Sequence, residues 1–252
     1  MISATERHDV AILTLAHGKA NLFDVEFSHA VADALDACAS SPAKAAVITA
    51  TGGIFSGGVD LRRLLEGGRS YAETFLPALG RAFDAAFAFP KPLVAAVNGH
   101  AIAGGCILAC AADWRLMSGQ PGRIGIPELL VGVPFPVVPL EIMRFATHAS
   151  QLQSLAYRGL TLAAAEALQY GLVDSVTDGD RLLDEAMAIA ESVAALPAEA
   201  FALTKAQLRE PALQRMKAGA STDVAVQNVW ASAATLGAIR GYVARTFKKP
   251  SG

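Results

Sequence analysis

The sequence predicts an α/β protein in which buried parallel strands alternate with helices. Two short and almost continuously apolar runs, AAVITATG (residues 45–52) and PLVAAVNG (residues 92–99), end in glycine and are typical of strands buried on both faces. A helix-like segment follows each run, and this order requires crossover connections and a largely parallel sheet. Hydrophobic residues make up 53% of the 252 residues and charged residues 17%, which supplies enough apolar material for one large core.

The individual elements follow from periodicity and from the residues that end them. Val31, Leu35 and Cys38 share one helical face, and Pro90 and Pro92 end a segment rich in leucine and phenylalanine. In chain order, the expected elements of this part are a strand at 9–17, a helix at 24–40, a strand at 45–52, a helix at 70–89, a strand at 92–99 and a helix at 107–113.

The pattern becomes mostly helical after about residue 161. The stretch TLAAAEALQYGLVDSV predicts a helix with Thr161 as its N-cap and Gly171 after its end, followed by a short extended piece. Further helices are expected at 181–196, 198–209, 211–236 and 238–247. We therefore divide the chain into an α/β core, residues 1–195, and a helical C-terminal region, residues 196–252.

Composition excludes several classes of function. The formal net charge of −2 argues against a nucleic-acid-binding protein, which needs a basic face to neutralise phosphates. No uncharged apolar run reaches the roughly 18 residues that span a bilayer, and the N-terminal MISATERHDV does not resemble a signal peptide. Three sparse cysteines, Cys38, Cys106 and Cys110, indicate reduced thiols in a cytoplasmic protein and no metal site.

Two glycine pairs follow the two buried strands, in FSGGVDL (residues 55–61) and AGGCILA (residues 103–109). Neither has the spacing of a nucleotide-binding loop. The simple interpretation is two tight strand-to-helix turns, where glycine supplies conformational freedom. The alternative is that the backbone N–H groups of Val59 and Gly104 point at one oxygen and form an oxyanion hole, with each donor worth about 3 kcal/mol in a transition state. Ile107, one turn into the helix, would keep such a site dry.

At these residues the chain resembles the crotonase superfamily, also called the enoyl-CoA hydratase/isomerase family. The resemblance covers nearly the whole chain, through FSGGVDL, NGHAIAGGCILACAADWRL, IGIPELLVGVPFP, YRGLTLAAAEALQYGLVDSV and LPAEAFALTKAQLR. It implies a spiral of ββα turns with a helical C-terminal trimerisation region, assembled as a homotrimer or a homohexamer. It also implies an acyl-CoA thioester as substrate, with no cofactor beyond the CoA of that substrate, and fatty-acid metabolism as the usual setting.

The resemblance assigns roles to particular residues. Val59 and Gly104 become the two amides that hold the thioester oxygen while an enolate forms. Contacts to the acyl-CoA fall on Lys19 and Ala20 in the early GKAN turn and on Asp60, Leu61 and Arg62 after the first glycine pair. Tyr242 and Arg245 correspond to an aromatic and basic pair that contacts the CoA of a neighbouring subunit. Asp60 also suits the N-cap of the following helix, and the cations also suit a solvated surface.

One acidic residue of the family's hydratases is missing here. Hydratases of this family use two glutamates, one on the helix after the second glycine pair and one in the Pro-Glu motif. In this chain the Pro-Glu position is Glu128, whereas the helix position is Ile107. The family's simple enoyl-CoA isomerases have this combination of one glutamate and one apolar residue. A glutamate in an apolar pocket has a raised pKa, which suits a group that takes up and returns a proton.

Three functions therefore stay open from the sequence. The first is an isomerase that moves the double bond of a 3-enoyl-CoA with Glu128 as its proton shuttle. The second is a 2-enoyl-CoA hydratase that works with one glutamate, or with a second acid supplied from elsewhere, such as Glu141. The third is a protein of the same fold that binds acyl-CoA without converting it. Asp113, at the end of a buried helix, is expected to be structural and hydrogen-bonded to backbone.

Overall fold

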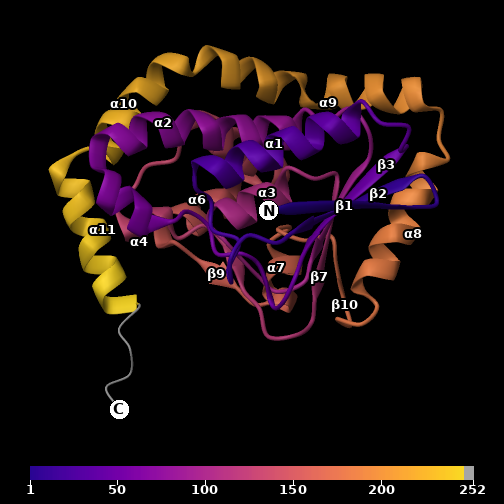
Figure 1. Cartoon of the computed structure of the whole chain (residues 1–252), viewed down its shortest axis with the longest axis horizontal. Helices are drawn as coiled ribbons and strands as arrows, with labels where there is room; N and C mark the ends of the chain where they lie inside the picture. The colour runs from indigo at the N-terminus through magenta and orange to yellow at the C-terminus, as the bar shows by residue number, and fades with distance from the viewer. Residues whose placement is uncertain (247–252) are drawn as a thin grey trace.

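The computed structural model describes residues 1–246, and it forms two sheets surrounded by helices (Figure 1). The larger sheet has the order β1-β2-β3-β5-β7-β10, and within it the β1–β2 pair is antiparallel and all other pairs are parallel. Its strands are β1 (Ile2–Arg7), β2 (Val10–Leu15), β3 (Ala45–Ala50), β5 (Leu93–Val97), β7 (Trp114–Ser118) and β10 (Ser175–Thr177). The predicted α/β class and parallel sheet are confirmed.

A smaller sheet of very short strands runs in the order β4-β6-β8-β9. Its members are β4 (Ile54–Ser56), β6 (His100–Ile102), β8 (Ile124–Gly125) and β9 (Thr161–Leu162). Three successive turns of the chain each place one strand in the larger sheet, the next strand in the smaller sheet, and then a helix. This is the ββα spiral that the family resemblance implies, and it brings β4, β6 and β8 side by side in parallel.

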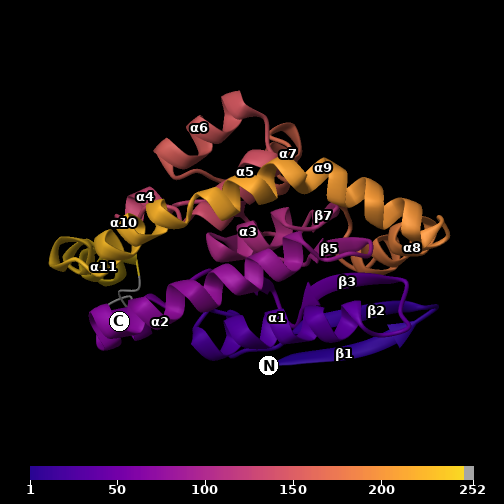
Figure 2. The same ribbon diagram turned by 90° about the horizontal axis from the view of Figure 1, so that it is seen from above.

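The helices cover the two sheets and extend beyond them at one end. They are α1 (Val25–Ala39), α2 (Leu61–Phe87), α3 (Gly104–Cys110), α4 (Glu128–Val131), α5 (Val137–Ala146), α6 (Ala149–Arg158), α7 (Ala164–Gln169), α8 (Leu182–Ala194), α9 (Ala198–Ala218), α10 (Ala220–Trp230) and α11 (Ala233–Thr246). Helices α1 and α2 lie side by side, and α10 and α11 lie near α2 and α4 at one end of the molecule (Figure 2).

Helix α2 begins earlier than the sequence predicts. Asp60 caps it by accepting the N–H groups of Arg62 and Arg63, at 3.0 and 3.1 Å. The helix then kinks at Gly68, which has φ +56°. Glycine is a poor helix former, so the pair at 67–68 hides the first two turns from a periodicity argument.

The C-terminal helices differ from the predicted ones at their breaks. Helix α9 runs through Pro211 without a break and ends at Ala218, before Gly219. Arg209 and Ala212, on either side of the proline, are both buried, so packing keeps the segment helical although proline removes one hydrogen bond. Thr161 lies in β9 and not at a helix N-cap, which is Ala163. No single helix within residues 1–246 is long and apolar enough to cross a membrane, although α8 and α9 pass that test as a pair bent by 104°.

Candidate functional site

The two glycine turns predicted from the sequence touch each other in the structure. The first follows β4 and the second follows β6, and these two strands are neighbours. A Cβ atom added to Gly58 would lie 2.8 Å from the carbonyl oxygen of Ile102 and 3.5 Å from the backbone nitrogen of Gly104. A Cβ added to Gly105 would lie 2.4 Å from the carbonyl oxygen of Ser56. Only residues without a side chain allow this approach, so the glycines serve close packing of two turns.

Two backbone N–H groups are left without acceptors where the turns meet. Phe23 donates to the carbonyl of Gly58 at 2.7 Å and accepts from the N–H of Asp60 at 2.9 Å, which fixes the backbone on both sides of Val59. Gly104 is the first residue of α3, so its N–H has no acceptor within the helix. Within the part of the chain that the structure describes, the N–H groups of Val59 and Gly104 donate to no protein atom. Each of them is therefore free to donate to a ligand.

Glu128 begins α4, three residues after the end of β8. Strand β8 pairs with β6, which leads into the second turn. Gly125 in β8 pairs with Ile102 in β6, and its carbonyl accepts the N–H of Ala103 at 2.8 Å. Only 8% of Glu128 is exposed, and its Oε2 atom is buried without a hydrogen-bond partner among residues 1–246. An unpaired buried carboxyl group is costly, so its presence indicates a functional demand.

Burial raises the pKa of Glu128 from an ordinary 4.5 to about 8. The nearby thiol of Cys106 in α3 remains neutral through this range, because a hydrogen bond with Cys110 and burial raise its own pKa, and the charge of Glu128 raises it further. A carboxyl group with a pKa close to neutrality exchanges a proton in both directions, which suits a single acid–base catalyst.

Among residues 1–246, the two other buried carboxylates, Asp24 and Glu141, are both paired with arginine. Ile107 is 3% exposed within the apolar core, on the helix that starts at Gly104. Glu141 is buried, but its carboxylate is paired with Arg215 at 2.5 Å and with Arg144 at 3.5 Å. The suggestion that Glu141 serves as a second acid stays a prediction, and in the structure both of its carboxylate oxygens are engaged by arginine. Asp24, also buried, is paired with Arg63 at 2.8 Å.

The residues predicted to contact acyl-CoA near the first turn do lie together. The carbonyl of Ala20 accepts the N–H of Gly57 at 2.8 Å, which brings the GKAN turn against the first glycine turn. Lys19 in that turn is exposed, and Arg62 on the first turn of α2 is exposed as well. Leu61 is half-buried against the core, and Asp60 acts as the helix cap described above. Two cations thus border the Val59 turn.

Tyr242 and Arg245 lie on the last helix, α11, which packs against α2 and α4 of the same chain. Tyr242 is half-buried against the core, whereas Arg245 is exposed near the end of the helix. Their predicted contact with the CoA of a neighbouring subunit stays a prediction.

Sequence reasoning missed the polar residues that brace the first turn. Asn21 is 2% exposed, has φ +47°, and donates through its side-chain amide to the carbonyls of Ile54 and Phe55. Asp24 accepts from His17 at 2.9 Å and from Arg63 at 2.8 Å, and it also caps α1. A sequence signal existed for the cap, because Asp24 precedes a helical pattern, but none existed for the long-range partners.

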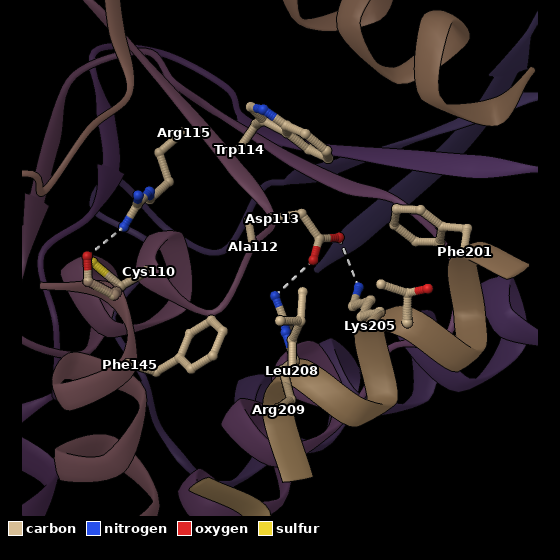
Figure 3. A pocket seen from close by; sticks show the side chains of 12 residues that line it. Cys110, Ala112, Asp113, Trp114, Arg115, Phe145, Phe201, Lys205, Leu208 and Arg209 are labelled. Atoms are coloured by element: carbon tan, nitrogen blue, oxygen red, sulfur yellow. Dashed lines mark hydrogen bonds and ion pairs between the residues drawn. The ribbon is translucent and has the colours of Figure 1, made fainter. Parts of the chain in front are cut away.

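A separate pocket of about 280 Å³ lies at the far end of α3, where Cys110 lines it. Asp113 lies between Lys205 and Arg209 of α9, at 2.7 Å from each (Figure 3). Its Oδ2 atom also accepts the N–H of Leu93 at 2.8 Å, so the expected structural role with a backbone bond is confirmed. Burial lowers the pKa of Lys205 from 10.5 to about 8, although the negative charge of Asp113 acts to raise it. This cluster ties α9 to the core.

The comparisons with known proteins identify the family and agree with the fold. The model of the enoyl-CoA hydratase/isomerase family matches residues 5–243. A Thermus thermophilus protein that carries the name of an enoyl-CoA hydratase is 32% identical over 209 residues, which are 81% of this chain and 82% of that protein. The apo structure of a Mycobacterium tuberculosis protein described as an enoyl-CoA isomerase matches with a TM-score of 0.81 and 28% identity, covering 92% of this chain and 98% of that one. Another structure of the same protein describes it as a probable enoyl-CoA hydratase.

A further structure, the human mitochondrial Δ3-Δ2-enoyl-CoA isomerase, matches with a TM-score of 0.90 and covers 97% of both chains. At 24% identity it speaks for the fold alone. Together with the ββα spiral, the paired glycine turns and the buried Glu128, the family match over nearly the whole length leads to one conclusion. The chain belongs to the enoyl-CoA hydratase/isomerase family, the crotonase superfamily.

Proposed function

We propose that the protein is an enoyl-CoA isomerase that converts a 3-enoyl-CoA into a 2-enoyl-CoA, with Glu128 as its only acid–base group. The observation that carries this proposal is the isolation of Glu128. It is buried and unpaired, while Ile107 is apolar and Glu141 is neutralised by Arg215. Adding water to a double bond in the hydratase manner calls on two carboxyl groups, whereas moving a proton between two carbons of one substrate calls on one.

In the proposed reaction, the thioester oxygen accepts hydrogen bonds from the N–H groups of Val59 and Gly104. Glu128 removes a proton from C2, the electrons of that C–H bond move toward the thioester, and a dienolate forms with its negative charge on the bound oxygen. The protonated Glu128 then gives the proton to C4, and the double bond closes between C2 and C3. The two amides stabilise the dienolate, and the raised pKa of Glu128 makes the return of the proton easy.

Further parts of the proposal concern the CoA group and the assembly. We propose that Lys19 and Arg62 bind the phosphates of CoA and that Ala20, Asp60, Leu61 and Ile107 contact the rest of the thioester. We also propose a homotrimer or homohexamer in which Tyr242 and Arg245 contact the CoA of a neighbouring subunit. Exposed apolar side chains on α5 and α9 support an interface between subunits, namely Phe145, Leu203 and Leu208.

The first test offers matched 3-enoyl-CoA and 2-enoyl-CoA thioesters to the purified protein and follows them by absorbance and mass. We expect the 3-enoyl thioester to rearrange without a change in mass, and the 2-enoyl thioester to gain no water. A gain of about 18 mass units by the 2-enoyl substrate, the mass of one water, would show that the protein is a hydratase. Tight CoA binding without conversion of either thioester would indicate a binding protein.

A second prediction concerns the close approach of the two turns. Gly58→Ala should lower kcat/KM for isomerisation by about 100-fold or more, because its methyl group would collide with the carbonyl of Ile102 and separate the two N–H donors. Gly58 also has φ +88°, a backbone conformation that costs an alanine energy wherever it occurs.

Gly52→Ala is the matched control for that prediction. Gly52 has φ +73°, yet a Cβ added there meets nothing within 4 Å. Its alanine variant therefore carries the backbone penalty without the collision. If Gly58→Ala and Gly52→Ala lose the same activity in a steady-state assay, the contact between the turns is not what activity depends on.

A further inference from the structure

The segment that carries Glu128 has little internal support. Helix α4 has only the four residues Glu128–Val131, and an irregular stretch follows it up to α5. One turn of helix does not hold itself in water. The carbonyl of Glu128 accepts the N–H groups of Gly132 and Val133, each at 3.1 Å, and Gly132 then reverses the chain with φ +90°. The position of Glu128 must therefore be fixed from outside the segment.

The C-terminal helices supply this support at three successive points. Ala238 of α11 packs against Gly132 so closely that a Cβ added to the glycine would lie 3.0 Å from its methyl group. Trp230, at the end of α10, donates from its indole Nε1 to the carbonyl of Pro134 at 2.8 Å. Asp223 of α10 accepts the N–H of Val137 at 2.8 Å.

These three contacts run in antiparallel order along the two pieces of chain. We call residues 128–137 the catalytic segment, because it begins with Glu128. From residue 132 to residue 137 along this segment, the contacting residues of α10 and α11 run backward, from 238 to 223. The contact by Asp223 also completes α5, because Pro136 at its N-cap has no side chain that can accept a hydrogen bond. Trp230 is 2% exposed, so its indole hydrogen bond is shielded from water.

We propose that Trp230 is a positioning residue for Glu128, and that α10 and α11 hold the catalytic segment in place within the same chain. The inference rests on the proposed function for the role of Glu128, but the contacts themselves do not depend on the reaction. The C-terminal helices would then position the catalytic base, in addition to any part that they have in assembly.

The test is Trp230→Phe, which keeps an aromatic ring and removes the N–H donor. We expect kcat for isomerisation to fall on the order of 10- to 100-fold with little change in KM, because the base is misplaced while the substrate contacts remain. We also expect the pKa of Glu128 to fall from about 8 toward its ordinary value, since a loosened segment admits water. Trp114→Phe is the matched control, because Trp114 lies in β7 beside the other pocket.

The pKa of Glu128 can be measured without any enzymatic assay. The pH dependence of thermal unfolding is compared between each tryptophan variant and the same variant carrying Glu128→Gln, and the difference reports the pKa of Glu128. A lower pKa in Trp230→Phe but not in Trp114→Phe supports the proposal, even if the wild-type protein proves not to be an isomerase.

An unchanged pKa and an unchanged kcat in Trp230→Phe would overturn the proposal. If Trp230→Phe does not fold, Asp223→Ala tests the same idea at the adjacent anchor, where the ring packing is left intact. It should lower the pKa of Glu128 in the same direction, and an unchanged pKa there would also overturn the proposal.

Discussion

Glu128→Gln should reduce isomerisation by at least about 1,000-fold, the largest effect that we expect from any single substitution on activity. Glutamine has the shape of glutamate but cannot accept the C2 proton at its amide. No other buried carboxylate within residues 1–246 is free to replace it, because Asp24 and Glu141 are each held by arginine. The measurement is kcat/KM for a 3-enoyl-CoA, together with circular dichroism to show that the variant is folded.

The same residue sets the expected pH dependence of the wild-type enzyme. Glu128 must be ionised to remove a proton, and its pKa in the free protein is about 8. Below that pH, kcat/KM should fall about tenfold for each further pH unit, and above it the rate should level off. A rate that is flat between about pH 5 and about pH 8, the range between ordinary and raised glutamate pKa values, would contradict the assignment.

The free energy of unfolding should fall as the pH rises, whereas kcat/KM should rise. Because the folded state raises the pKa of Glu128 from 4.5 to about 8, the unfolded chain releases the proton first as the pH rises. The wild-type protein therefore loses stability between these two values, whereas Glu128→Gln has no proton to lose. The variant should match the wild type at acidic pH and exceed it by a few kcal/mol above about pH 8. Equal pH dependence of the two proteins would show that Glu128 is solvated in the folded state.

The sequence located the elements that are long enough to show a pattern. The pattern over residues 24–40 predicts a helix, and α1 spans Val25–Ala39 between the caps Asp24 and Ser40. The strands of the smaller sheet have only two or three residues, too few for any periodicity, and they exist because the spiral sets them side by side. They are also the elements that bring the two glycine turns together.

The site was predictable to the extent that it is local in sequence. The glycine pairs, Glu128 after Pro127, and Ile107 could each be found within short motifs. The hydrogen bonds that hold these motifs in place could not be found in this way, because each joins distant segments. Trp230 contacts Pro134, 96 residues away in the sequence, and Arg209 contacts Asp113, also 96 residues away. In the sequence alone, a lysine or arginine on α9 is also interpreted as a surface residue until its buried partner is known. What sequence reasoning lacked was therefore the pairing between the core and the C-terminal helices.

Asp113→Asn should lower the free energy of unfolding by about 3–5 kcal/mol, because it leaves two buried cations without their counter-charge. This is the largest loss of stability that we expect from any substitution proposed for this protein. The side chains of Lys205 and Arg209 are 7% and 4% exposed, and both are paired with this carboxylate. Their other hydrogen bonds go to the neutral backbone carbonyls of Lys91 and Phe87. Lys205 can respond by losing its proton, since burial already lowers its pKa to about 8. Arg209 cannot, because a guanidinium stays charged.

This difference between the two cations gives the prediction its sharpest test. Adding Lys205→Met to Asp113→Asn should recover only part of the loss, because the arginine remains buried and unpaired. Asp9→Asn is the control: it breaks an ion pair with Lys44 in which both side chains are largely exposed, and denaturant unfolding should register almost no change. If Asp113→Asn is no more harmful than Asp9→Asn, hydrogen bonds to neutral asparagine suffice. The attachment of α9 to the core would then rest on neutral hydrogen bonds and apolar packing, with the charge of Asp113 contributing little.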